Sequence, residues 1–443
     1  MKAVAAAGAV AAFWLAVWVL VAALVAQPLI LPGPGAVAVA LLRLVWDAGT
    51  WAILAGSGAR ILGGLALAAV CGGVLAGISS RSRAFARLVA PALSFVKATP
   101  VACVVVLLLI WLGSARVSIA AVFLMALPGV YFSLVEGLAQ ANKPLEQMFR
   151  LHGVRGWRLF CAHTWREVLP FVLSCARAVI GMSWKAGVAA ELIGMAAGTV
   201  GERIYQAKLL IETADLLAWT VLVVAASWAC ERVLVWLLRV SGPVAWGAAV
   251  RSHGRAGGPA GGGVAAELAL AVGDRAPWAP ALDGLVFNVL AGGRICVMGA
   301  SGVGKSTLLA LAAGECAPCS MVFQDVRLVE DASALDNVLV CADACVDASS
   351  AAALLRLLVP GVDVHARVAE LSGGQRRRVE IARALLCPGD AVILDEPFTG
   401  LDAAARDVCA EVVLDLLDGR MLLLATHDAV DARALDISDI ITL

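Results

Sequence analysis

The chain has 443 residues, of which 61% are hydrophobic and only 15% are charged, and its formal net charge is zero. A soluble globular protein does not need so apolar a composition, and the balanced charge excludes the basic footprint of a nucleic-acid-binding protein. Most charged residues lie after residue 250 or in short islands before it. The composition therefore predicts a membrane half followed by a soluble half.

The first half contains apolar segments that are long enough to cross a bilayer as helices. We expect six spans, at residues 10–31, 61–78, 88–112, 117–135, 169–195 and 216–238. The loops that follow the second and the fourth span carry more lysine and arginine residues than the alternate loops of this half. Basic loops indicate the cytoplasmic side, so an even number of spans places both chain ends in the cytoplasm.

Two of the apolar segments allow a second interpretation. The first segment with Lys2 in front of it has the pattern of a signal peptide, but it lacks a convincing small-residue cleavage site, so we interpret it as an uncleaved helix. Residues 36–59 are apolar but include Arg43 and Asp47. We expect an interfacial or re-entrant helix on the outer face there, with a seventh span as the alternative.

A glycine-rich stretch in the second half predicts a phosphate-binding loop. It reads Gly299-Ala300-Ser301-Gly302-Val303-Gly304-Lys305-Ser306-Thr307 and lies between two apolar runs, which gives the order strand, loop, helix. Glycines let backbone N–H groups turn toward a phosphate, and the helix N-terminus adds its positive dipole end. We expect Lys305 to reach the β- and γ-phosphates of a nucleoside triphosphate and Ser306 to bind Mg²⁺.

The 12 cysteines are scattered, and many lie inside apolar runs. Cys316 and Cys319, with Cys341 and Cys345, form a weak pattern for a zinc site because no histidine accompanies them. We interpret these thiols as small apolar side chains that stay reduced in the cytoplasm.

Several motifs around this loop resemble those of ATP-binding-cassette ATPases and follow in the order of that family. They are Gln324 in 321–325, Leu-Ser-Gly-Gly-Gln at 371–375, Asp395 and Glu396 after the apolar run 391–394, Asp402, and His427 after the apolar run 422–425. The resemblance implies that Gln324 contacts Mg²⁺ or the attacking water and that Asp395 holds Mg²⁺ through water. It also implies that Glu396 is the general base and that His427 meets the γ-phosphate.

The same resemblance places the remaining ATP-binding residues. Ser372, Gly373, Gly374 and Gln375 open a helix, form a second anion site, and in this family face the glycine loop of another subunit. Asp402 lies in the dimer-contact loop. Trp278, between predicted strands at 265–272 and 285–289, is expected to stack on adenine, with a surface tryptophan as the alternative. The short path from Lys305 to Gln324 implies a truncated antiparallel β subdomain.

The basic loop at 143–167 resembles the coupling loop of binding-protein-dependent permeases of the same family. We expect Glu146 to lie in a short amphipathic helix that docks on the ATPase and ends at Gly153. Met148 and Phe149 stand where the family has two alanines, and its glutamate position is nearer Gln147. The docking geometry is therefore expected to be specific to this chain.

Three segments resemble the nitrate, sulfonate and taurine branch of these permeases: Arg60–Gly64, Lys97–Pro100 and Ser183–Gly194. Charges inside spans need a partner or water. Lys97, Lys185 and Glu191 therefore line a path for an anionic substrate or form structural pairs between helices, and we favour the structural interpretation.

The predicted architecture has two parts. The first is an all-α polytopic membrane domain of about six transmembrane helices with the type I importer permease fold. The second is an α/β cassette ATPase domain with the P-loop NTPase fold and a shortened antiparallel β subdomain. We expect the permease domain at 1–240, a glycine-rich linker at 241–263 that begins where Ser241-Gly242-Pro243 end the last span, and the ATPase domain at 264–443.

The resemblance implies ATP-driven import of a small solute across the cytoplasmic membrane. The expected cargo is a nitrate-, sulfonate- or taurine-like anion, with a thiamine-precursor pyrimidine as the alternative. The expected cofactors are ATP and Mg²⁺. The expected partners are a second copy of the chain, an extracytoplasmic substrate-binding protein, the lipid bilayer and a small-molecule substrate, but no nucleic acid. A half-size exporter and a non-transporting signalling ATPase are less favoured readings of the same motifs.

Overall fold

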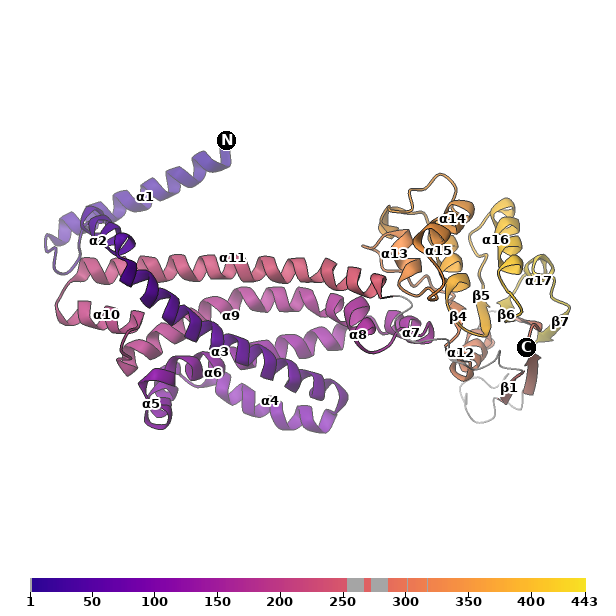
Figure 1. Ribbon diagram of the computed structural model, residues 1–443, viewed down its shortest axis with the longest axis horizontal. Coiled ribbons are helices and arrows are strands. Elements are labelled where there is room, and N and C mark those ends of the chain that lie inside the picture. Colours follow the sequence, from indigo (N-terminus) through magenta and orange to yellow (C-terminus); the bar gives the residue numbers. More distant parts are fainter. Residues whose placement is uncertain (1, 253–266, 272–285, 301, 317) are drawn as a thin grey trace. The chain divides into compact units, whose positions relative to one another are not determined.

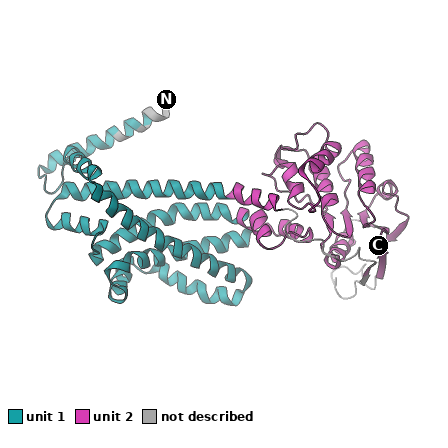
Figure 2. Ribbon diagram, in the orientation of Figure 1, with its two compact units in different colours: residues 1–141, 167–241 teal, residues 142–166, 242–443 magenta. Residues whose placement is uncertain are grey.

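The computed structural model describes residues 2–252, 267–271, 286–300, 302–316 and 318–443. The chain divides into two compact units, which Figure 2 shows in different colours. Unit 1 consists of residues 1–141 and 167–241, and unit 2 consists of residues 142–166 and 242–443. The loop at 142–166 therefore belongs to the same unit as the C-terminal half of the chain.

Unit 1 is built from helices, and unit 2 combines helices with strands (Figure 1). The helices that lie wholly or mostly in unit 1 are α1 (Lys2–Val25), α2 (Pro34–Trp46), α3 (Ala48–Arg81), α4 (Arg83–Ala98), α5 (Val101–Leu112), α6 (Ser114–Gln140), α9 (Trp165–Gly194), α10 (Val200–Leu209) and α11 (Thr213–Arg251). The helices of unit 2 are α7 (Lys143–Leu151), α8 (Gly156–Leu159), α12 (Lys305–Glu315), α13 (Ala334–Leu339), α14 (Ala348–Leu358), α15 (Gly373–Leu386), α16 (Ala403–Asp415) and α17 (Ala429–Ala434).

Five of the described helices are long and apolar enough to cross a membrane, or six if the pair α4 and α5 counts as one span. The predicted span at 88–112 is broken, because α4 and α5 are bent by 102° relative to each other. The break lies at Thr99 and Pro100, where the proline ring disfavours helical geometry in the residue before it. The other predicted spans coincide with α1, α3, α6, α9 and α11, with shifted ends.

The prediction of one interfacial or re-entrant element at 36–59 is wrong. The short helix α2 ends at Trp46, and residues 48–59 form the first part of the long helix α3. Asp47 separates the two helices because its carboxylate caps α3, accepting hydrogen bonds from the N–H groups of Gly49 at 3.2 Å and Thr50 at 3.1 Å. The acidic residue that suggested an interfacial helix is therefore a helix cap.

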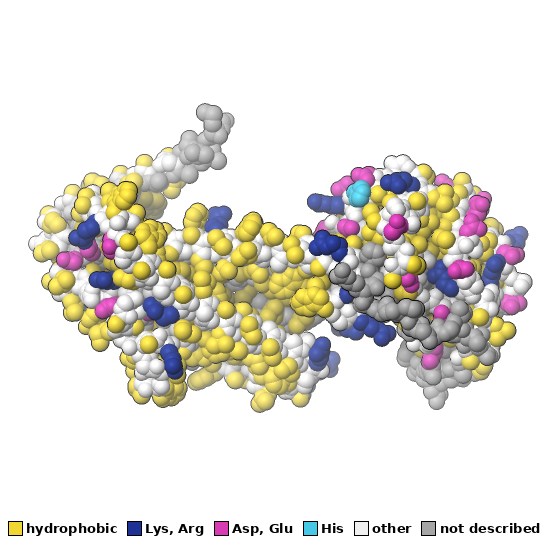
Figure 3. All heavy atoms as spheres, in the orientation of Figure 1, with side chains coloured by type: hydrophobic (Ala, Val, Ile, Leu, Met, Phe, Trp, Pro, Cys, Tyr) yellow, Lys and Arg dark blue, Asp and Glu magenta, His cyan; other side chains and the backbone are white. Residues whose placement is uncertain are grey.

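Small residues allow the helices of unit 1 to pack closely. A Cβ atom on Gly64 of α3 would lie 2.5 Å from the carbonyl oxygen of Ile119 in α6, and one on Gly187 of α9 would lie 2.5 Å from Cγ1 of Ile61 in α3. Close backbone approach at small residues is how membrane helices gain packing energy without a hydrophobic driving force. Hydrophobic side chains cover most of the visible face of unit 1 (Figure 3), as a lipid-facing surface requires.

The carboxylate of Glu191 connects helices α3, α9 and α10. It is fully buried (0% exposed) and accepts hydrogen bonds from Ser57 Oγ at 2.8 Å, Arg60 Nε at 3.2 Å and the N–H of Gly201 at 3.4 Å. Ser57 Oγ in turn accepts a bond from the N–H of Val200 at 3.0 Å, at the start of α10. These contacts favour the structural interpretation of Glu191.

Replacing Glu191 by alanine is expected to lower the free energy of unfolding of the full chain by about 3–5 kcal/mol, because it leaves the partly buried Arg60 guanidinium without its carboxylate. Thermal unfolding in detergent, followed by tryptophan fluorescence, measures the change. The control is Glu136→Ala, which removes an exposed carboxylate of α6 that contacts only Gln140 among the described side chains. Equal unfolding midpoints for the two variants would contradict the prediction.

Unit 2 contains a parallel sheet and a separate antiparallel strand pair. The strands are β1 (Glu267–Ala271), β2 (Val286–Leu290), β3 (Arg294–Met298), β4 (Ser320–Val322), β5 (Ala391–Asp395), β6 (Met421–Thr426) and β7 (Asp439–Thr442). The five-stranded sheet has the order β4-β5-β6-β3-β7, and all its neighbours are parallel. β1 and β2 pair antiparallel, which confirms the two strands predicted there. Between α12 and β4 the described residues contain no strand, so the antiparallel subdomain is short, as expected.

The predicted end of the last span at residues 241–243 is wrong. Helix α11 continues through Pro243 to Arg251, so the first part of the predicted linker is helical. Ser241 Oγ donates to the carbonyl of Leu238 at 2.6 Å, and Trp246 and Val250 beyond the proline are buried in the core of unit 2. This burial explains why the helix tolerates the proline, since tertiary packing outweighs the loss of one backbone hydrogen bond.

Candidate nucleotide site and coupling surface

Four of the predicted motifs follow the carboxyl ends of neighbouring parallel strands. The glycine loop follows β3, Gln324 lies two residues after β4, Asp395 ends β5 with Glu396 directly after it, and His427 follows β6. The strand ends are in register, with Met298 opposite Thr426 and Asp395 opposite Ala425. Side chains at the carboxyl ends of parallel strands meet at one edge of a sheet, which is where open α/β sheets bind their ligands.

The glycine loop turns sharply between β3 and α12. Gly302 has φ +82° and Gly304, which precedes the helix, has φ +117°, both in the region that favours glycine. The side chain of Lys305 is buried, and its Nζ donates to the carbonyl oxygens of Gly299 at 2.7 Å and Ala300 at 3.0 Å. The lysine therefore bends back over the loop. Ser301 lies outside the described residues.

Asp395 and Ser306 form a site with the chemistry of a magnesium centre. The Ser306 hydroxyl donates to the Asp395 carboxylate, which is only 2% exposed. Burial raises the pKa of Asp395, although this hydrogen bond and the nearby Lys305 oppose the shift. Its Oδ1 atom has no hydrogen-bond partner among the described residues. A buried carboxylate oxygen beside a hydroxyl matches the oxygen ligands that Mg²⁺ takes through water or directly.

Glu396 lies directly after this carboxylate, in an unusual backbone conformation. Its φ is +48°, which is costly for a residue with a Cβ, and its N–H donates to the carbonyl of Ala425 at 2.9 Å. Its Oε1 lies 3.4 Å from Nδ1 of His427, and the histidine ring is exposed. The pair has the geometry in which a carboxylate accepts a proton and an imidazole orients the acceptor.

The stretch 371–375 begins helix α15 and is exposed where the helix starts. Ser372 and Gln375 form a capping box, in which the Ser372 N–H donates to Gln375 Oε1 at 2.8 Å and the Gln375 N–H donates to Ser372 Oγ at 3.3 Å. A Cβ on Gly374 would lie 3.2 Å from the carbonyl oxygen of Gly400. The structure therefore brings this stretch next to the loop before Asp402, which caps α16 by accepting from the Ala405 N–H at 2.8 Å.

A buried ion network connects α15 with the backbone around Gln324, and the sequence reasoning missed it. Arg377 donates to the carbonyl oxygens of Phe323 and Gln324 and pairs with Glu380 at 2.9 Å. Glu380 is fully buried and also pairs with Arg383 at 3.3 Å. Burial raises the pKa of Glu380 even though both arginines oppose the shift. The sequence feature that could have predicted this network is the spacing of three residues between the charges, which places them on one face of the helix.

The loop that resembles a coupling loop packs into unit 2. Leu145, Met148 and Phe149 of α7 are buried in the same hydrophobic core as the parallel sheet. The Leu151 carbonyl accepts from the Cys319 N–H at 3.0 Å, next to β4. The two side chains that replace the alanines of the family are thus fully buried (0% exposed), because they fill the interface between α7 and the sheet.

The two residues chosen as coupling candidates take different places in this loop. Gly153 has φ +77°, and a Cβ there would lie 3.5 Å from Cβ of Pro318, so the glycine ends α7 where the loop meets the cassette. Glu146 forms an ion pair with Arg150 at 2.7 Å along the helix surface. Sequence reasoning missed a further ion pair, between Arg166 and Asp331 at 3.0 Å.

Three other candidates stand apart from these contacts. Lys97 and Lys185 are exposed in unit 1. Trp278, the candidate adenine-stacking residue, lies outside the described residues.

Two family models match the chain. The model described as "Binding-protein-dependent transport system inner membrane component" matches residues 69–243, and the model described as "ABC transporter" matches residues 282–399. The chain is 34% identical over 191 residues to a lipoprotein-releasing system ATP-binding protein of Xanthomonas axonopodis pv. citri, which covers 35% of this chain and 78% of that protein.

Two further relatives are transport ATPases with other cargoes in their names. An aliphatic sulfonates import ATP-binding protein of Paracoccus denitrificans is 34% identical over 180 residues, covering 38% of this chain and 73% of that protein. A thiamine import ATP-binding protein of a Jannaschia species is 34% identical over 178 residues, covering 34% of this chain and 77% of that protein.

These matches define a fused permease and cassette ATPase with transmembrane helices, and the chain belongs to the ABC transporter family. Its ATPase domain binds ATP and hydrolyses it in a reaction that is coupled to transport.

Proposed function

We propose that this chain is the fused permease and ATPase subunit of an importer that receives its cargo from an extracytoplasmic binding protein. The observation that carries the proposal is the match of residues 69–243 to a binding-protein-dependent inner-membrane component, in the same chain as a match of residues 282–399 to the ABC transporter model. This match favours an importer over a half-size exporter or a signalling ATPase. The membrane is then the cytoplasmic membrane, with the ATPase domain in the cytoplasm.

In this proposal the residues at the sheet edge divide the work of hydrolysis. The loop Gly299–Thr307 holds the triphosphate, and Ser306 and Asp395 hold Mg²⁺ with help from Gln324. Mg²⁺ supplies positive charge that stabilises the transferred phosphoryl group. Glu396 accepts a proton from the attacking water, and His427 holds Glu396 and the γ-phosphate in position.

A second copy of the chain completes the site. We assign the exposed start of α15, with Ser372, Gly373, Gly374 and Gln375, to the γ-phosphate held by the partner subunit, as the resemblance to cassette ATPases implies. Asp402, beside it, then lies at the contact between the two ATPase domains. One chain supplies one ATPase domain and one permease domain, so a homodimer with two-fold symmetry contains two complete sites.

The proposed cargo is a small anion of the nitrate, sulfonate or taurine type. Support comes from the segments Arg60–Gly64 and Ser183–Gly194 and from the sulfonate-import relative. The exposed Lys97 and Lys185 are cations available to such an anion. The relative named for thiamine import supports a thiamine-precursor pyrimidine as the second candidate.

The test is reconstitution of the full chain in lipid vesicles with binding proteins, each loaded with one cargo: taurine, an alkanesulfonate, nitrate or an aminopyrimidine. We expect ATP hydrolysis to rise severalfold with one loaded binding protein and to stay at the basal rate with the same protein unloaded. Cargo accumulation inside right-side-out vesicles gives an independent readout. Full hydrolysis without any binding protein, unchanged when each is added, would overturn the importer assignment.

A further inference from the structure

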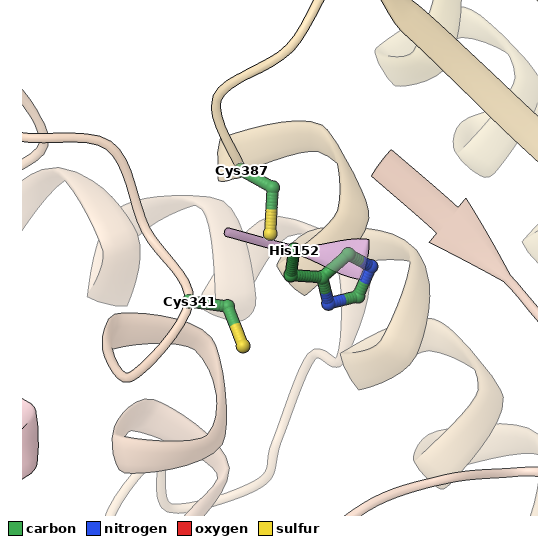
Figure 4. Close-up of side chains that lie close together, drawn as sticks. All are labelled: His152, Cys341 and Cys387. Carbon is green, nitrogen blue, oxygen red and sulfur yellow. The ribbon is translucent and has the colours of Figure 1, made fainter. Parts of the chain in front are cut away.

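Three side chains that bind soft metals meet in the core of unit 2. They are His152, the first residue after α7, Cys341, two residues after α13, and Cys387, the residue that ends α15 (Figure 4). Their ligand atoms all lie within 4.8 Å of one another. All three residues are buried, with 1%, 1% and 3% exposed surface respectively. They come from three distant parts of the sequence, so no motif with a fixed spacing predicts this group.

The imidazole of His152 is oriented for coordination. Its Nε2 lies 3.2 Å from the carbonyl oxygen of Met321 and accepts a hydrogen bond from the N–H of Met321 at 3.1 Å. Nδ1 is buried without a hydrogen-bond partner within the described parts of the chain, so it is the nitrogen left for a ligand. When Nδ1 binds a metal ion, the ring proton moves to Nε2 and is donated to the Met321 carbonyl. Figure 4 shows the ring beside the two sulfur atoms, with one nitrogen on their side. A histidine whose second nitrogen donates to a backbone carbonyl is the usual arrangement of a metal-binding imidazole.

Positive charge surrounds the two thiols. Arg158 donates to the carbonyl of Val340 at 2.6 Å, next to Cys341, and Arg420 donates to the carbonyl of Cys387 at 3.4 Å. The positive charge of Arg383 also acts on both thiols and favours their thiolate form.

We propose that His152, Cys341 and Cys387 bind one thiophilic d¹⁰ metal ion, Zn²⁺ or Cu(I), which ties the coupling loop to the cassette. Two metal–sulfur bonds and one metal–nitrogen bond form, and the two thiol protons are released to solvent. Both ions prefer thiolate and imidazole ligands. Cu(I) accepts these three ligands alone, whereas Zn²⁺ takes a water molecule as its fourth ligand.

This site differs from the thiol pattern visible in the sequence. Cys319 donates its thiol proton to the Ala313 carbonyl at 3.6 Å, and it is outside the group formed by His152, Cys341 and Cys387. Only Cys341 belongs to both sets. The thiol pattern in the sequence contains no histidine. In the structure the histidine of the site comes from the coupling loop, which precedes the cassette in the chain.

The experiment measures metal binding by the full chain in detergent, after reduction and removal of metal with a chelator. In one arm Co²⁺ replaces Zn²⁺ as a spectroscopic probe, and in the other Cu(I) is added in competition with a chromophoric Cu(I) chelator. We expect one metal ion per chain, with a thiolate-to-Co²⁺ charge-transfer band if the site takes Zn²⁺ and removal of Cu(I) from the chelator if it takes Cu(I). About two protons are released per ion bound, as a pH-stat records.

The variants Cys341→Ser, Cys387→Ser and His152→Gln test the ligand set. Loss of an outer-shell partner already costs about 10–100-fold in metal affinity, so we expect each serine variant to weaken binding by about 100-fold or more. The matched control is Cys409→Ser, a buried thiol of α16 outside the group, which is expected to keep one ion per chain. ATP binding by every variant reports whether its cassette is folded.

The wild-type measurements do not depend on how the variants fold. No bound ion in either arm, or no proton release on binding, would overturn the proposal. Metal binding that is equal in the wild type and in a folded Cys341→Ser, Cys387→Ser double variant would also overturn it, because the ion would then lie elsewhere.

Discussion

Replacing Glu396 by glutamine is expected to reduce steady-state ATP hydrolysis by about 100-fold or more while ATP binding persists. Glutamine keeps the size of the side chain but cannot accept a proton from water. The backbone of residue 396 is held by its hydrogen bond to Ala425, so the variant keeps the same geometry at the end of β5. The measurements are phosphate release and equilibrium ATP binding by the purified full chain.

The control for this substitution is Glu411→Gln, which changes an exposed carboxylate of α16 in the same way. It is expected to hydrolyse ATP at the wild-type rate. In the proposed dimer the Glu396→Gln variant also retains ATP long enough for two chains to co-elute in the presence of the nucleotide. Hydrolysis by Glu396→Gln at the wild-type rate would remove Glu396 as the general base and would direct attention to His427.

Replacing Phe149 by alanine is expected to uncouple transport from hydrolysis. Phe149 is fully buried in the interface between α7 and the sheet, where removal of an aromatic side chain costs about 3–5 kcal/mol. About 1.4 kcal/mol already equals a factor of ten in an equilibrium, so the docked state of the loop loses at least that factor. We expect cargo accumulated per ATP hydrolysed to fall by about tenfold or more, while basal hydrolysis continues.

Gln147→Ala is the matched control, because Gln147 lies on the exposed side of the same short helix. Uptake and hydrolysis are measured in the same vesicles for both variants. If Phe149→Ala and Gln147→Ala gave the same ratio of uptake to hydrolysis, the buried face of α7 would not transmit the motion of the ATPase. A loss of ATP binding in Phe149→Ala would show instead that the loop helps to hold the cassette folded.

The catalytic motifs were readable in the sequence because their chemistry is local. The loop Gly299–Thr307 needs only consecutive glycines, a lysine and a hydroxyl between a strand and a helix, and each of these is visible without knowledge of the fold. The same holds for the apolar runs before Asp395 and His427. Parallel strands then bring such strand ends to one edge, so the order of the motifs already implied a common site.

Helix ends were less predictable. The expected stop at Ser241-Gly242-Pro243 relied on the local preference of proline, whereas the expected single span at 88–112 relied on apolar length and disregarded Pro100. In the structure Pro243 lies inside a continuous helix, and Pro100 lies at a 102° bend. The difference comes from packing, because Trp246 and Val250 bury the turns beyond Pro243 in the core of unit 2. Local preference is a weak signal when tertiary contacts compete with it.

The sequence alone therefore determined the class of the protein, its division into a permease and an ATPase, and the candidate residues of the nucleotide site. The tertiary structure decided which partners the remaining polar groups have. Glu191 meets Arg60 across two helices, Arg377 reaches the backbone of the Gln324 loop, and His152 meets Cys341 and Cys387. A charge or a thiol in a sequence shows what it is able to bind, but only the fold fixes its neighbours, because those neighbours come from segments far away in the chain.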